Sequence, residues 1–129
     1  MAGEHPMNQA RGMEWFMCVA ESQPPYAVIR RFLFGDPNRP EEWFRVVTWS
    51  PSSETRELIG WCRSFEAACT VGWDYRCAFE SWRHYNASRR VDATAMTKNR
   101  PAAAEMLRFY RDSQKRSETI APRLNRSID

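Results

Sequence analysis

Three consecutive segments in the first half of the chain have the side-chain patterns of β-strands. Residues 26–34 are rich in β-branched and aromatic side chains. In 42–49 one face would carry Phe44, Val46 and Thr48, and the other Trp43, Arg45, Val47 and Trp49. In 56–63, Leu58, Gly60 and Cys62 would lie opposite Ile59, Trp61 and Arg63. Because short polar loops join the segments, the pattern predicts an antiparallel sheet of three strands.

Apolar residues at helical spacing predict helices before and after this sheet. Residues 8–21 carry Met13, Phe16, Met17 and Ala20 at such a spacing, which predicts a first helix. The clearest helix is 65–85, which follows Ser64 as a credible N-cap. A last helix is expected over 99–116, with Pro101 in its first turn.

These elements predict an α+β fold in which one α-β-β-β-α domain is followed by a further helix. The expected domain spans 8–88, with the three-stranded antiparallel sheet packed on helices. A polar linker at 89–98 then leads to the C-terminal helix at 99–116. The two ends of the chain, 1–7 and 117–129, are expected to be flexible. A length of 129 residues with 43% hydrophobic and 27% charged side chains fits one globular domain.

The order helix, three strands, helix resembles that of the double-stranded RNA-binding domain over residues 12–85. The resemblance depends on Pro25-Tyr26-x-Val28, on Phe44-x-Val46, and on Leu58-Ile59-Gly60 followed by Ser64 and Ala68. It implies the fold of that family. In the same register Phe65, Glu66 and Cys69 occupy the positions of the lysines with which the family binds RNA.

Several classes of protein are disfavoured by what the sequence lacks. No stretch of ~18 apolar residues occurs, and residues 1–11 lack the order of a secretion signal, so we expect a cytoplasmic protein outside the membrane. Cys18, Cys62, Cys69 and Cys77 form no Cys-x-x-Cys pair, so we interpret them as small apolar residues and expect no metal site.

Catalytic groups are not evident either. The only histidines are His5 and His84, and neither lies in a pattern with a nucleophile or a carboxylate. The five glycines are scattered singly and form no phosphate-binding loop. We therefore expect no enzyme, no cofactor and no small-molecule substrate.

The six tryptophans are the most unusual feature of the composition. If helices cover the Phe44 face of the sheet, the opposite face carries an apolar surface edged by arginine. The residues expected to bind a protein there are Trp43, Arg45, Trp49, Trp61 and Arg63. The partner would be another protein or a second copy, as in a small adaptor or inhibitor of the kind that phages and plasmids encode. Alternatively, the last helix covers this face with Met106, Leu107 and Tyr110.

Nucleic acid is the alternative partner. Residues 89–129 carry 10 basic and 5 acidic side chains, against 9 and 11 in residues 1–88. Arginine and lysine in this region could neutralise phosphates while aromatic rings of the sheet stack on bases. The cationic candidates are Arg30, Arg31, Lys98, Arg100, Arg108, Arg111, Lys115 and Arg116.

Overall fold

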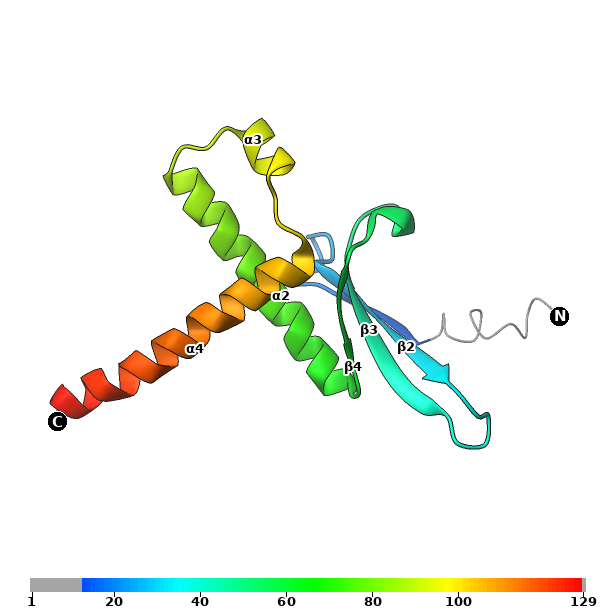
Figure 1. Cartoon of the computed structure of the whole chain (residues 1–129). Coiled ribbons are helices and arrows are strands. Elements are labelled where there is room, and N and C mark those ends of the chain that lie inside the picture. Colours follow the sequence, from blue (N-terminus) through cyan, green and yellow to red (C-terminus); the bar gives the residue numbers. More distant parts are fainter. Residues whose placement is uncertain (1–12, 129) are drawn as a thin grey trace.

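The computed structural model describes the backbone of residues 13–128 and the side chains of 13–117. The chain forms a sheet of four antiparallel strands in the order β1-β2-β3-β4, followed by helices (Figure 1). The strands are β1 (Glu14–Met17), β2 (Ala27–Phe34), β3 (Glu41–Thr48) and β4 (Leu58–Cys62), with a 3-10 turn, η2 (Ser53–Thr55), before β4. The helices are α2 (Phe65–Ser88), α3 (Ala93–Lys98) and α4 (Ala103–Ile128). The α+β class is therefore confirmed.

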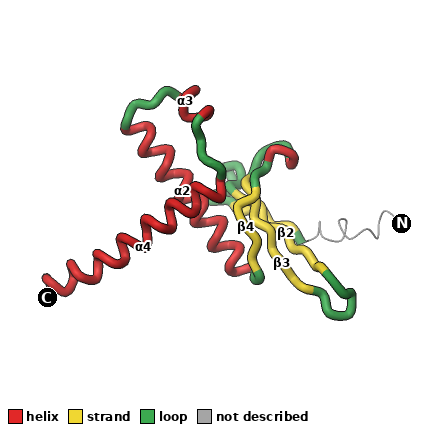
Figure 2. Tube along the Cα trace, in the orientation of Figure 1, coloured by secondary structure: helices red, strands yellow, loops and turns green. Residues whose placement is uncertain are grey.

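The long helices α2 and α4 pack on one side of the sheet. Helix α2 contacts β2, β3 and β4, while α4 crosses α2 and also contacts β4. Figure 2 shows the long helices α2 and α4 together on one side of the strands. The C-terminal half of α4 projects away from both layers (Figure 1). We call the side turned toward the helices the covered face and the other side the open face.

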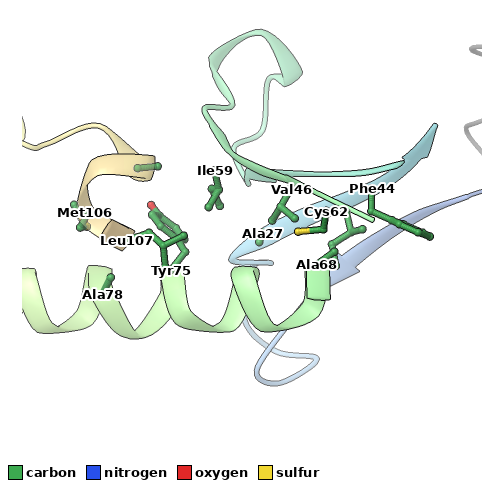
Figure 3. Close-up of a cluster of buried hydrophobic side chains, with 12 residues drawn as sticks. Ala27, Phe44, Val46, Ile59, Cys62, Ala68, Tyr75, Ala78, Met106 and Leu107 are labelled. Carbon is green, nitrogen blue, oxygen red and sulfur yellow. The ribbon is translucent and has the colours of Figure 1, made fainter. Parts of the chain in front are cut away.

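The hydrophobic core fills the space between the covered face and the two long helices. From the sheet it includes Ala27, Ile29 and Val46, none of which is exposed. Figure 3 shows Ala68, Tyr75 and Ala78 reaching it from α2, and Met106 and Leu107 from α4. Apolar burial of this extent is the main source of stability in a domain of this size.

The expected first helix is wrong: residues 14–17 form strand β1, while residues 8–12 of that helix lie outside the described part. Alternation places Trp15 and Met17 on the covered face, where the Trp15 ring lies 4.6 Å from Phe65. A Cβ atom on Gly72 of α2 would lie 2.7 Å from the Met17 sulfur, so glycine permits this close approach. Pairing with β2 and packing on α2 outweigh the helical spacing.

The sheet consequently has four strands rather than the predicted three. The order α-β-β-β-α, on which the resemblance to the double-stranded RNA-binding domain depended, becomes β-β-β-β followed by helices. A β-bulge is a second departure from simple alternation. Gly60 pairs with Val46 and Leu58 pairs with Val47, so Ile59 is an extra residue and turns into the core.

Helix α2 begins where the sequence predicts, since the Ser64 hydroxyl accepts a hydrogen bond from the Ala67 amide. The expected linker at 89–98 contains the short helix α3, capped by Asp92. Helix α4 begins just after Pro101 and continues to Ile128, so the segment expected to be a flexible tail from 117 is helical. The expected flexible segment 1–7 lies outside the described residues.

Candidate functional site

The open face carries side chains in rows that run across the four strands. The register aligns Phe16, Val28, Val47 and Leu58 in one row. The next row is Glu14, Arg30, Arg45 and Trp61, and beyond it Phe32 lies opposite Trp43. Since paired residues in antiparallel strands point to the same face, these side chains form one continuous surface.

Four rings near the β2–β3 turn form what we call the aromatic cluster: Phe32, Phe34, Trp43 and Trp61. The rings of Phe32 and Phe34 are parallel, with centroids 5.7 Å apart. The indole of Trp61 lies 5.4 Å from Phe32 and meets Trp43 edge to face at 6.5 Å. Although they contact one another, Phe34 is 45% exposed and Trp61 42% exposed. The cluster therefore presents accessible ring surface to solvent.

Guanidinium groups lie among these rings. The Cζ atoms of Arg45 and Arg30 lie 5.0 Å and 5.4 Å from the centroid of Phe32. Arg63 lies 4.6 Å from the ring of Trp43 and also forms an ion pair with Glu41. These distances are within the range of cation–π attraction, which holds each guanidinium against a ring.

Beside the aromatic cluster on the open face, Arg30, Arg45 and Arg56 surround a cavity of about 140 Å³ that we call the arginine pocket. Its remaining lining residues are Glu14, Ser53, Val28 and Val47. Burial, and then the charge of Arg30, lower the pKa of the Arg45 guanidinium. Arg56 reaches the pocket from the segment after η2, where its Nε donates a hydrogen bond to the Ser50 carbonyl. Its Cζ also lies 5.9 Å from the ring of Phe16.

Of the residues expected to bind a protein, Trp43, Arg45, Trp61 and Arg63 lie together on the open face. Trp49 does not join them, because β3 ends at Thr48 and the alternation ends with it. Trp49 lines a separate cavity beside α2, together with Tyr26 and Tyr75.

The alternative in which the last helix covers the tryptophan face is wrong. Met106 and Leu107 of α4 are buried beside Tyr75 and Ala78 of α2, on the covered side of the sheet. Tyr110 packs against the same core. The apolar side chains of α4 in the described residues thus pack on α2 and do not cover the open face.

The cationic residues expected to bind nucleic acid are divided among different surfaces. Arg30 alone lies on the open face, since Arg31 points to the covered side and pairs with Glu42. Arg100 pairs with Glu57, and Arg111 pairs with Asp74 of α2. The others lie on the helices, with Lys98 in α3 and Arg108, Lys115 and Arg116 exposed on α4. The C-terminal cations therefore do not extend the open face.

Sequence reasoning missed three contributors to this surface: Phe32, Phe34 and Arg56. The first two could have been found, because 28–34 places Val28, Arg30, Phe32 and Phe34 on one side of a strand. Arg56 lies outside any strand, so no periodicity marks it.

Other kinds of site are not evident in the described residues. Within 13–128 no helix is long and apolar enough to cross a membrane. Among the side chains of 13–117, no group of three or more His, Cys, Asp or Glu could hold a metal ion. All four cysteines are free thiols, and burial raises the pKa of Cys62. Comparison of the chain with protein-family models, curated proteins and solved structures gives no match.

Proposed function

We propose that this protein is a non-catalytic module that binds single-stranded nucleic acid across its open face. The observation that carries the proposal is the mixture of exposed rings and guanidinium groups on the side of the sheet that the described helices do not cover. Proteins that bind single strands without sequence preference combine aromatic rings, which stack on bases, with cations that follow the phosphates. A cytoplasmic location belongs to the same proposal.

The arrangement favours a single strand over a duplex. Ring surface of Trp61 and Phe34 is accessible at one end of the open face, and Phe16, which is 50% exposed, lies at the other. Unstacked bases of a flexible strand can lie on such rings, whereas the bases of a duplex are already stacked on each other. Arg30 and Arg45 lie between the two groups of rings, where a backbone joining the stacked bases would pass.

The charge of the open face supports a polyanion as partner more than a second copy of the chain. Among the described residues, four cations, Arg30, Arg45, Arg56 and Arg63, face two carboxylates, Glu14 and Glu41, which sum to 4 − 2 = +2. A two-fold homodimer through this surface would place the same positive patch on both sides of the interface. Like charges across an interface disfavour association.

A fluorescence anisotropy titration with a labelled oligothymidylate of about 20 nucleotides tests the proposal, since such a strand exceeds the ~4–16 nucleotides of common sheet sites. A blunt duplex of equal length serves as comparison. We expect the single strand to bind more tightly than the duplex. We expect Trp61→Ala to weaken binding about tenfold or more, because one base stack contributes about 1–3 kcal/mol.

Trp73→Ala is the matched control. Trp73 is 47% exposed, close to the 42% of Trp61, but it lies on α2 and packs against Tyr26. Equal affinity of the wild type for duplex and single strand would contradict the proposal. An equal loss of single-strand affinity in Trp61→Ala and Trp73→Ala would contradict it as well. Far-UV circular dichroism of each variant establishes that the fold is intact before binding is compared.

A protein partner is the second candidate, favoured by the shallow, open hollow that Phe34, Trp43 and Trp61 line at the open face. An apolar side chain would fit between these rings, and neighbouring carboxylates would complement the arginines. Selecting a random peptide library on the wild type, with counter-selection on Trp61→Ala, tests this candidate. Enriched peptides should combine a large apolar residue with Asp or Glu. Light scattering tests the homodimer, and a dimer that Trp61→Ala dissociates would overturn the charge argument.

A further inference from the structure

We infer that the arginine pocket is a phosphate site, which holds one phosphate group of the bound strand. The identity of the strand rests on the proposed function above, while the pocket itself can be tested with inorganic phosphate. No local sequence pattern brings these three arginines together, because Arg30, Arg45 and Arg56 come from β2, from β3 and from the segment before β4.

The three guanidinium groups approach one cavity from different directions. Arg30 and Arg45 lie opposite each other in the register of β2 and β3, and Arg56 reaches in from the edge near η2. Val28 and Val47, which are 1% and 9% exposed, form an apolar floor beneath them. Ser53 adds a hydroxyl at the rim. A tetrahedral oxyanion suits such a site, because each planar guanidinium can donate to different oxygens.

Arg45 and Arg56 lack the salt-bridge partners that other arginines in the described part of the chain have. Arg31, Arg63 and Arg100 each form an ion pair with a carboxylate, as do Arg83 and Arg111. Within residues 13–117 no carboxylate forms a salt bridge with Arg45 or Arg56, and the buried Nε of Arg45 has no hydrogen-bond acceptor. Like charges directly opposite in neighbouring strands are destabilising. An anion in the pocket would relieve this repulsion and accept the remaining hydrogen bonds.

Net charge favours phosphate over a carboxylate. The pocket has three cations and one carboxylate, Glu14, so its local charge is 3 − 1 = +2. A carboxylate offers two oxygens in one plane, which one guanidinium fork already satisfies. A phosphate group can engage guanidinium groups on several sides. The pocket also adjoins Phe32, whose ring contacts both Arg30 and Arg45, so a phosphate here lies next to the aromatic cluster.

The first arm of the test uses the full chain and inorganic phosphate. Nuclear magnetic resonance of arginine side-chain Nε–H groups follows a titration with sodium phosphate, with sodium acetate at matched ionic strength as comparator. We expect saturable shifts for Arg45 and Arg56 and none for Arg31, which lies on the covered face. Arg56→Gln should weaken the phosphate response of Arg45 about tenfold, since it removes charge-assisted hydrogen bonds. Absence of a saturable shift on phosphate addition would overturn the pocket. An equal response to acetate would overturn the choice of phosphate.

The second arm measures oligothymidylate affinity between about 50 and 200 mM NaCl. Losing one phosphate contact should reduce the slope of log affinity against log salt by about 0.7. We expect this for Arg56→Gln and Arg45→Gln but not for Arg108→Gln, a control on the exposed side of α4. If Trp61→Ala weakens oligothymidylate binding while Arg56→Gln has the same salt slope as the control variant Arg108→Gln, the pocket is overturned and the proposed function stands. If phosphate binds but the oligonucleotide does not, the proposed function is overturned and the pocket stands.

Discussion

On the covered face of the sheet Arg31 lies beside Glu42 in an ion pair, whereas on the open face Arg30 and Arg45 lie opposite one another. The same two strands thus place their arginines in two different electrostatic environments. The covered face also buries Ile29 and Val46 under helices, while the open face leaves rings such as Trp61 in contact with solvent. Packing and charge pairing account for the first arrangement. The second leaves Arg45 without a salt bridge among the described residues, and it is the basis of the ligand proposed above.

The two tryptophans on opposite faces give the largest expected contrast. Trp15 packs on Phe44 and Phe65 under the helices, so Trp15→Ala should lower the free energy of unfolding by about 3 kcal/mol or more. Trp61→Ala should lower it by only about 1–2 kcal/mol, because the 42% exposed ring loses contact on one side only. Urea titration measures both values.

Oligonucleotide affinity should show the opposite contrast, with the larger loss in Trp61→Ala and the smaller in Trp15→Ala. Trp15→Ala, assayed where it is folded, should bind the oligonucleotide like the wild type, since Trp15 points away from the open face. If Trp15→Ala and Trp61→Ala lose stability and binding in the same proportion, the two faces do not have separate roles.

Substituting one valine on each face sharpens the comparison. The chemical change is the same, but helices pack over Val46 and arginine side chains over Val28. Val46 is 0% exposed among the core residues, and Val46→Ala should lower the free energy of unfolding by about 2–3 kcal/mol. Val28 is 1% exposed, but it lies under the arginine pocket. The aliphatic parts of the arginine side chains can fill the volume left by the deleted methyl groups, so Val28→Ala should lower the free energy of unfolding by about 1 kcal/mol. Equal midpoints in urea would mean that the open face is packed as rigidly as the core.

Much of the fold was predictable, because strict alternation marks β3 and a serine cap marks the start of α2. The β1 strand was not, since its four residues have too little local signal to compete with the helical spacing of Phe16, Met17 and Ala20. Its stability depends on tertiary contacts, namely pairing with β2 and the approach of Met17 to Gly72. Such contacts are invisible in a local pattern.

The site was predictable to the same extent as the strands. Alternation placed Trp43 and Arg45 on one face, where the structure has them. It failed for Trp49, which follows the end of β3, and for Ile59, which the bulge turns inward. The C-terminal basic residues looked like one surface in the sequence, but α4 packs on α2, away from the open face. Charge composition alone carries no information on which side of the molecule the basic residues face.

The smallest expected effect is the most direct test of the electrostatic comparison between the faces. Arg31→Met removes a partly exposed ion pair and should lower the free energy of unfolding by up to about 1 kcal/mol. Arg45→Met keeps an apolar chain over Phe32 and removes one of two facing charges, so it should leave stability unchanged or raise it by up to about 0.5 kcal/mol. Added NaCl should shrink the difference between the two variants, because salt screens both the attraction and the repulsion. If Arg45→Met instead destabilises the protein as much as Arg31→Met, the open-face arginines serve the fold, and the need for an anionic ligand disappears.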